Sequence, residues 1–152
     1  MKTTNKLDRT FGPFGASTGL FMTIGGIVMI YFSLTGIIVI LIGTFVGLTS
    51  TSTIIDWDKR KIKYSNNFFG IFKTGPWINI EPTMKLGIRK SNKGWQAYSR
   101  SNMPLSINFR DYRIILYDSN NKKIMPVKKT NTLDSARREL EILSNQLGLS
   151  FI

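Results

Sequence analysis

Residues 10–55 read TFGPFGASTGLFMTIGGIVMIYFSLTGIIVILIGTFVGLTSTSTII, and none of these 46 residues is charged. The apolar core of a bilayer is about 30 Å thick, so a helix that rises about 1.5 Å per residue crosses it in about 20 residues. The stretch is therefore long enough for two spans and a short turn. Serine, threonine and glycine interrupt the apolar run near residues 31–36. We expect helices over Phe14–Tyr31 and Leu34–Leu48.

Two other kinds of segment, a signal peptide and a buried helix pair, are also rich in apolar residues. A secretory signal peptide has a short apolar core followed by a small-residue cleavage site, whereas this stretch is far longer and has no such end. A helix pair buried inside a soluble protein needs enough chain to cover it on all sides. The roughly hundred residues that follow are too few for that, so the sequence favours a membrane anchor.

The charges flanking the stretch predict its orientation. The chain carries 21 Lys and Arg against nine Asp and Glu, a net charge of +12. Lys2, Lys6 and Arg9 precede the apolar stretch and all other basic residues follow it. Positively charged flanks stay on the cytoplasmic side of a membrane. We expect a multi-pass protein of the inner, cytoplasmic membrane with both termini in the cytoplasm, divided into residues 1–10, 11–50 and 51–152.

Glycines in the apolar stretch suggest how its two helices pack. Gly15 and Gly19, like Gly43 and Gly47, are four residues apart, a spacing of small residues that lets helix backbones approach closely in lipid. If the chain reverses between them, the two pairs lie at similar depth and could pack together. The alternative is that glycine is simply frequent in membrane helices.

From Thr51 onward, apolar and polar residues alternate, which is typical of β-strands. Turn-forming residues recur every eight to twelve positions and predict about seven short antiparallel strands. One predicted turn is the polar stretch Lys90–Gly94. At the C-terminus, Thr132 can cap a helix and Gly148 can end it. Leucines at three- and four-residue steps between them predict one amphipathic helix that covers the β layer.

This order of parts, a helix pair, about seven strands and a terminal amphipathic helix, resembles small bacterial membrane proteins with a pleckstrin-homology-like domain. The stretches that carry the resemblance are Ile55–Tyr64, Gly70–Trp77 and Thr132–Leu149. It implies a mainly β, or α+β, domain with one bent sheet or small barrel capped by the terminal helix. It also implies that basic residues of the first hairpin contact lipid headgroups, here Lys59, Arg60, Lys61 and Lys63.

The composition argues against several classes of function. The chain has no Cys and no His, which excludes Cys/His zinc sites, thiol nucleophiles and Ser-His-Asp triads. The acidic residues show no paired or metal-binding spacing beyond Asp56 and Asp58, which more simply shape a turn. We therefore expect no enzyme activity, no catalytic residue, no metal and no cofactor. We also find no nucleic-acid-binding motif, and expect no nucleic-acid partner.

These observations favour a non-enzymatic, membrane-anchored binding or scaffold module. We expect its basic domain to lie on the cytoplasmic leaflet and to contact anionic lipid headgroups. A protein partner or self-association is expected as well. The alternative is a subunit of a larger membrane complex, for transport or envelope assembly, in which the helix pair oligomerises.

Overall fold

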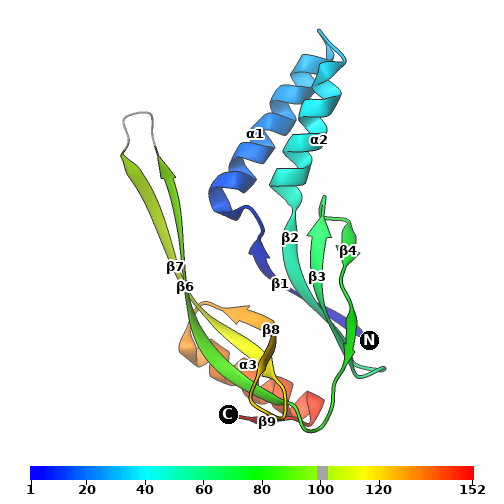
Figure 1. Ribbon diagram of the computed structural model, residues 1–152, viewed down its shortest axis with the longest axis vertical. Coiled ribbons are helices and arrows are strands. Elements are labelled where there is room, and N and C mark those ends of the chain that lie inside the picture. The colour runs from blue at the N-terminus through cyan, green and yellow to red at the C-terminus, as the bar shows by residue number, and fades with distance from the viewer. Residues whose placement is uncertain (99–102) are drawn as a thin grey trace.

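The computed structural model describes residues 1–98 and 103–152, which form three helices and nine strands. The helices are α1 (Gly12–Ile30), α2 (Thr35–Leu48) and α3 (Leu133–Leu147). The strands are β1 (Lys2–Arg9), β2 (Ser50–Asp56), β3 (Lys61–Phe68), β4 (Phe72–Thr74), β5 (Trp77–Asn79), β6 (Lys85–Tyr98), β7 (Pro104–Tyr117), β8 (Lys123–Thr130) and β9 (Ser150–Phe151). The α1–α2 pair projects from one end of the molecule, and α3 lies near the other (Figure 1).

The first sheet lies at the base of the helix pair, since β1 leads into α1 and β2 follows α2. Its strand order is β1-β2-β3-β4, and β5 also pairs with β3. Strands β1 and β2 are antiparallel neighbours, with Arg9 opposite Ser50 and Lys2 opposite Asp56. The two helices are therefore an insertion between neighbouring strands, and the two ends of this insertion are held side by side. The N-terminal segment, which we expected to be a simple basic flank, is a strand of the sheet.

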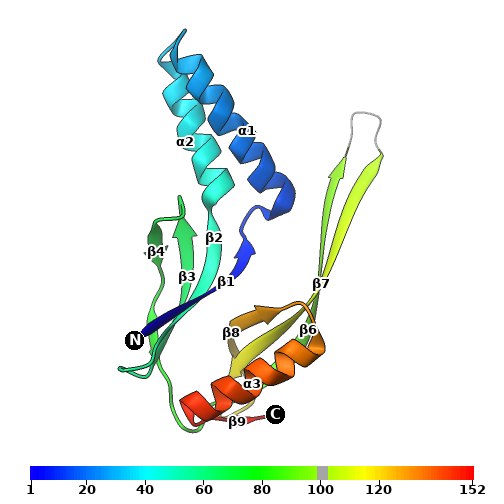
Figure 2. The same cartoon turned by 180° about the vertical axis from the view of Figure 1, so that it is seen from behind.

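The second sheet has the order β8-β7-β6-β9. Strands β6 and β7 have 14 residues each and pair along their full length, from Lys85 opposite Tyr117 to Tyr98 opposite Pro104. Half of this hairpin extends beyond the rest of the sheet as a two-stranded arm. The arm points in the same direction as α1 and α2 (Figures 1 and 2).

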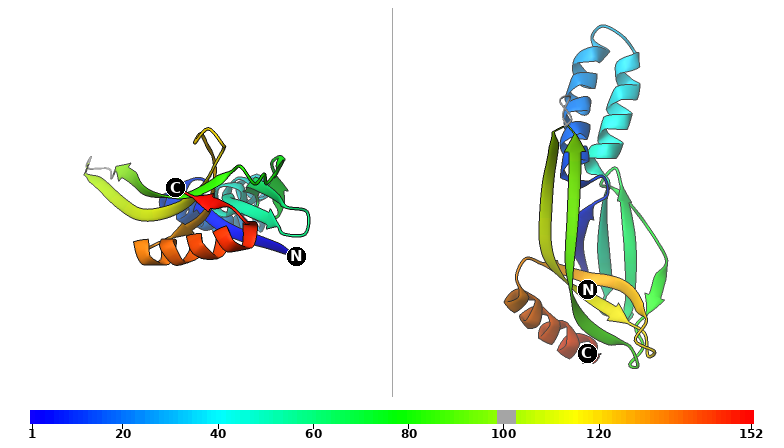
Figure 3. Two further views of the ribbon diagram at one scale, coloured as in Figure 1. Left: turned by 90° about the horizontal axis from the view of Figure 1, so that it is seen from below. Right: turned by 60° about the vertical axis from the view of Figure 1, so that its left-hand side comes forward.

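The core lies where both sheets and α3 meet. Helix α3 packs on β6, β7 and β8 at the end of the molecule away from α1 and α2 (Figure 3), and its predicted caps are confirmed. The Thr132 side chain accepts a hydrogen bond from the Ser135 amide, and Gly148 has the left-handed conformation that ends many helices. The buried apolar residues of the core are Ile55, Ile62, Ile80, Met84, Leu86, Ile114, Leu116, Met125, Val127, Leu140, Leu143, Leu147 and Leu149.

Helix α1 is long and apolar enough to cross a membrane, by its length of 19 residues and its composition. Helix α2 packs against it but has only 14 residues. At about 1.5 Å per residue, α2 is roughly 21 Å long and falls short of a bilayer core of about 30 Å. The predicted positions of both helices agree with the structure to within two residues at their ends.

The predicted fold, a two-helix transmembrane hairpin followed by a pleckstrin-homology-like domain, is wrong. Among the helices of the described chain, only α1 meets the length of a membrane span. The multi-pass topology therefore has no support. In addition, the strands form two separate sheets of five and four strands, where we expected one bent sheet of about seven. The polar N-terminal strand, which the sequence pattern did not reveal, completes the first of these sheets.

The predicted turn at Lys90–Gly94 is also wrong. These residues lie in the middle of β6 and pair with residues 108–112 of β7. Consecutive polar residues are typical of turns, but here they lie where the hairpin leaves the rest of the sheet. Pairing with β7, some 20 residues further along the chain, decides their conformation.

Candidate functional site

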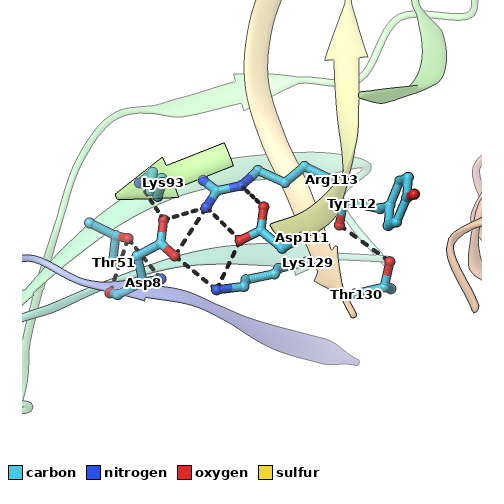
Figure 4. Close-up of polar contacts among 8 residues, drawn as sticks. All are labelled: Asp8, Thr51, Lys93, Asp111, Tyr112, Arg113, Lys129 and Thr130. Atoms are coloured by element: carbon cyan, nitrogen blue, oxygen red, sulfur yellow. Dashed lines mark hydrogen bonds and ion pairs between the residues drawn. The ribbon is translucent and has the colours of Figure 1, made fainter. Parts of the chain in front are cut away.

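Five charged side chains meet where the first sheet touches the second (Figure 4). Asp8 of β1 lies at the centre: its carboxylate oxygens are 2.7 Å from Lys93 Nζ, 2.9 Å from Arg113 Nη2 and 3.2 Å from Lys129 Nζ. Asp111 is bound by Arg113 and Lys129, each at 3.0 Å. We call these five residues the intersheet ion network. It ties β1 to strands β6, β7 and β8.

The backbone explains why these side chains converge. Asp111 and Arg113 are two apart in β7 and so lie on the same face of the strand. Lys129 of β8 is the register partner of Arg113. In β1 the register shifts between Lys6 and Arg9, and this irregularity includes Asp8, whose amide nitrogen contacts the Thr51 hydroxyl at 3.3 Å. Irregularities of this kind re-aim a side chain.

Contacts within the network favour the charged form of its acidic and basic groups. Burial by itself would raise the pKa of Asp8 and Asp111, but hydrogen bonds and charges from Lys93, Arg113 and Lys129 outweigh it and lower both. Burial likewise opposes the charge of Arg113 and Lys129, and the two carboxylates raise the pKa of both. A general acid or base needs a pKa near the working pH. None of these four groups is shifted towards neutrality, so the network is suited to holding structure and not to transferring protons.

Two recesses flank Asp8 at the base of the helices. The smaller, of about 270 Å³, is lined by Asp8, Arg9, Lys93 and Lys129 together with the first turn of α1. The larger, of about 540 Å³, opens under the end of α2, and we call it the helix-foot recess. Its lining residues are Thr4, Lys6, Leu7, Asp8, Arg9, Gly47, Leu48, Thr49, Ser50, Thr51, Asn67, Gly70 and Lys73.

Aromatic side chains surround the same end of α2. The Phe45 ring stacks on Phe68 with centroids 6.1 Å apart, and it meets Phe69 and Phe11 edge to face at 5.4 and 5.8 Å. We call these four residues the aromatic collar. Phe11 precedes the first residue of α1, Phe45 lies near the end of α2, Phe68 ends β3 and Phe69 lies in the β3–β4 turn. Aromatic rings are typical of the boundary between bilayer and water.

The predicted headgroup contacts Lys59, Arg60, Lys61 and Lys63 lie elsewhere. They occupy the β2–β3 turn and the start of β3, at the far end of β2 from the helices (Figures 1 and 2). Seven residues of strand separate the two ends by roughly 20 Å. That is about twice the distance over which salt screens exposed charges.

Two of these basic residues have structural contacts. The Arg60 guanidinium donates a 2.7 Å hydrogen bond to the Leu147 carbonyl at the end of α3, where helices favour a positive charge. Lys63 donates to the Lys73 carbonyl and lies 5.7 Å from the Trp77 ring centroid. Both contacts belong to the body of the domain.

Of the predicted packing glycines, three lie between the helices. A Cβ atom added to Gly19 would come within 2.4 Å of the Gly47 nitrogen and 2.7 Å of the Gly43 oxygen. At Gly15, by contrast, an added Cβ atom would first meet Phe11, which lies four residues earlier in the chain and does not belong to α2.

Sequence reasoning missed a second close approach nearer the tip. There a Cβ on Gly36 would lie 2.6 Å from the Gly26 oxygen. These two glycines belong to no four-residue repeat of the kind we searched for.

Replacing Gly19 by leucine should therefore force the helices apart. We expect a loss of about 1–3 kcal/mol in the stability of the helix pair, because overpacking a tight contact costs that much. Gly25→Leu is the matched control, since a Cβ there meets nothing within 4 Å. Thermal melting of the full chain in detergent measures both variants. Equal melting temperatures would contradict the close packing at Gly19.

The described residues contain no group of three or more His, Cys, Asp or Glu side chains that could hold a metal ion. Comparison with known proteins adds no identification: no family model, no curated protein and no solved structure matches this chain.

Proposed function

We propose that the chain is a non-enzymatic, membrane-anchored binding module. In this proposal the apolar surfaces of α1 and of the shorter α2, which does not reach across a bilayer, enter the lipid from one face, and the basic β sheets lie against anionic headgroups at the bilayer surface. One observation carries it: the helix pair projects from the sheets and is apolar around its whole circumference. Its exposed apolar side chains include Leu20, Phe21, Ile24, Ile27, Val28, Ile30, Ile37, Ile38, Leu41 and Ile42.

The energetics favour a lipid environment for this pair. Moving one such side chain out of water contributes about 1.5–3 kcal/mol, and at least ten are exposed here. Two hydroxyls within the helices need no external partner, because Thr23 and Thr44 donate to carbonyls of their own helix, those of Gly19 and Ile40. Such internal pairing is what a helix requires in hydrocarbon.

The sheets support one orientation of the helix pair in the membrane and one depth of insertion. Because β1 pairs with β2, the chain enters and leaves the helix pair at the same level, so both helix ends share one face of the membrane. Basic residues dominate that face, which by the positive-inside rule is cytoplasmic. The aromatic collar then marks the boundary between lipid and water. Both termini lie in the cytoplasm in this arrangement.

A binding role fits the charged groups better than catalysis does. In the intersheet ion network, the pKa of Asp8 and Asp111 is lowered and that of Lys129 is raised by their mutual contacts, which favours the ionised form of each group. The larger recess lies beside the proposed bilayer surface. We therefore propose contact with anionic lipid, and with a protein partner or a second copy, as its activity.

Single cysteines test the anchoring directly, because the natural chain has none. Leu41→Cys in α2 and Ser119→Cys in the β7–β8 turn are both at exposed positions. After cell-free synthesis into liposomes, a membrane-impermeant maleimide should label the residue-119 variant at once. It should label the residue-41 variant at least tenfold more slowly until detergent is added. Equal labelling of both variants without detergent would show that the helices are not embedded.

A further inference from the structure

The helix-foot recess combines three features that recur in sites for amphiphilic anions: unpaired cations, a polar floor and an apolar wall. We propose that this recess binds the phosphate headgroup of an anionic phospholipid whose acyl chains lie along α2. The inference rests on the proposed membrane anchoring and identifies the ligand of that membrane face. It also moves the headgroup contact from the β2–β3 turn to the opposite end of β2.

The cations of the recess are Lys6, Arg9 and Lys73, all of them exposed. None of the three forms an ion pair with an acidic residue in the part of the chain that the structure describes. The acidic residue of the lining, Asp8, is already bound by Lys93, Arg113 and Lys129. Three positive charges therefore remain for an anion.

The floor of the recess supplies neutral polar groups. Asn67 is buried, and its amide nitrogen donates to the hydroxyls of Ser50 and Ser52 at 3.4 and 3.0 Å. This bonding fixes Ser50 in place at the edge of the recess, next to Thr51. Hydroxyl groups beside cations are common partners of phosphate oxygens, because they add donors without adding size.

The upper wall distinguishes a lipid from a free phosphate. It is formed by Gly47 and Leu48, the last turn of α2, and by Gly70 of the neighbouring β3–β4 turn. Beside Gly70, Ile71 and Phe72 expose 76% and 63% of their surface. A phosphate in the recess would thus adjoin an apolar path that leads along α2 into the bilayer. The volume of about 540 Å³ is within the range of small-molecule sites.

The test is lipid selection by the full chain in a neutral detergent. Phosphatidylglycerol and phosphatidylcholine are added in equal amounts, and native mass spectrometry counts the bound lipids. We expect a preference for phosphatidylglycerol that falls roughly a hundredfold in the triple variant Lys6→Gln/Arg9→Gln/Lys73→Gln, since each of the three cations near an anionic group contributes about a fivefold effect. A variant with Lys6→Arg and Lys73→Arg should keep the preference, which guards against misfolding as the cause.

The control removes the same charge elsewhere. Lys59→Gln/Lys61→Gln/Lys122→Gln should leave the preference unchanged, because all three positions lie away from the recess. An equal loss in this control would overturn the site in favour of net charge. Displacement of the lipid by millimolar glycerol phosphate would overturn the lipid assignment in favour of a free phosphate ester. Protection of the residue-41 cysteine in liposomes is read independently, so anchoring can stand while the headgroup site fails.

Discussion

Replacing residues 11–48 by the dipeptide Asn-Gly should yield a folded β protein that stays in solution without detergent. The Thr10 amide donates to the Thr49 carbonyl at 3.1 Å, and Arg9 faces Ser50 in the next register position. These two strand ends are therefore already spaced for a tight hairpin, and Asn-Gly favours the turn that joins such strands. Circular dichroism and urea unfolding would show whether the sheets persist.

The same variant should lose its association with neutral vesicles by at least two orders of magnitude in a flotation assay, because it lacks the ten or more exposed apolar side chains that the proposed anchoring places in lipid. A full-length chain with Ser119→Asn/Asn120→Gly is the control, since it carries the same dipeptide in the β7–β8 turn and keeps the helices. Undiminished flotation of the shortened chain would contradict the anchoring role. An unfolded product would contradict the view that the helices are an insertion into an otherwise complete sheet.

The largest effect of a single substitution is expected at Arg113. Its side chain is 11% exposed and forms ion pairs with two carboxylates, those of Asp8 and Asp111. The Asp111 side chain is 3% exposed. Arg113→Met leaves these carboxylates close together with too few partners. Removing one member of a buried ionic group costs about 3–5 kcal/mol. Urea unfolding of the chain lacking the helices, or thermal melting of the full chain in detergent, would measure the loss.

A surface arginine provides the control, and pH provides a second test. Arg138→Met on the exposed side of α3 should change stability by less than about 0.5 kcal/mol. The carboxyl pKa values are lowered in the folded chain from 3.8, so their stabilisation is complete above that value and is lost as the pH falls through the lower folded values. The difference between wild type and Arg113→Met should therefore shrink in acid.

At high pH the basic residues lose their charge, and the stabilisation by the network is again lost. The pKa of Lys129 is raised in the folded chain from 10.5, so its stabilisation is complete below that value and is lost as the pH rises through the higher folded value. The difference between the two proteins should be flat between about pH 5 and pH 9. A difference that varied across this interval would contradict a network of permanently ionised groups.

The sequence predicts those elements whose conformation is decided by neighbouring residues, and it misses those that depend on distant pairing. The two helices over residues 12–48 follow from the length of the uncharged apolar stretch, and the helix capped by Thr132 follows from leucine periodicity and end signals. All three helices are present. Strand β1 has one buried apolar residue, Leu7, among polar neighbours, so no alternation marks it. Its strand character comes from pairing with β2, more than 40 residues away.

The helix-foot recess likewise depends on contacts between residues that are distant in sequence. Basic residues could be listed from the sequence, but which of them stay unpaired depends on contacts such as Asp8 with Lys129, 121 residues apart. A cluster at Lys59–Lys63 is conspicuous because its members are adjacent in sequence. The recess draws Lys6, Arg9 and Lys73 from three separate segments, and only the fold brings them together.

The pairing of β1 with β2 also sets an order for biosynthesis. Strand β1 leaves the ribosome before the helices, and its partner follows only after the whole of α1 and α2 has been made. At about 5–20 residues per second, β1 waits several seconds as an unpaired edge. Under the proposed anchoring, the first sheet can then close only if the inserted chain has returned to the face where β1 was left. Sheet closure would thus act as a checkpoint: in that arrangement, a chain whose helices end on opposite sides of a membrane cannot complete its fold.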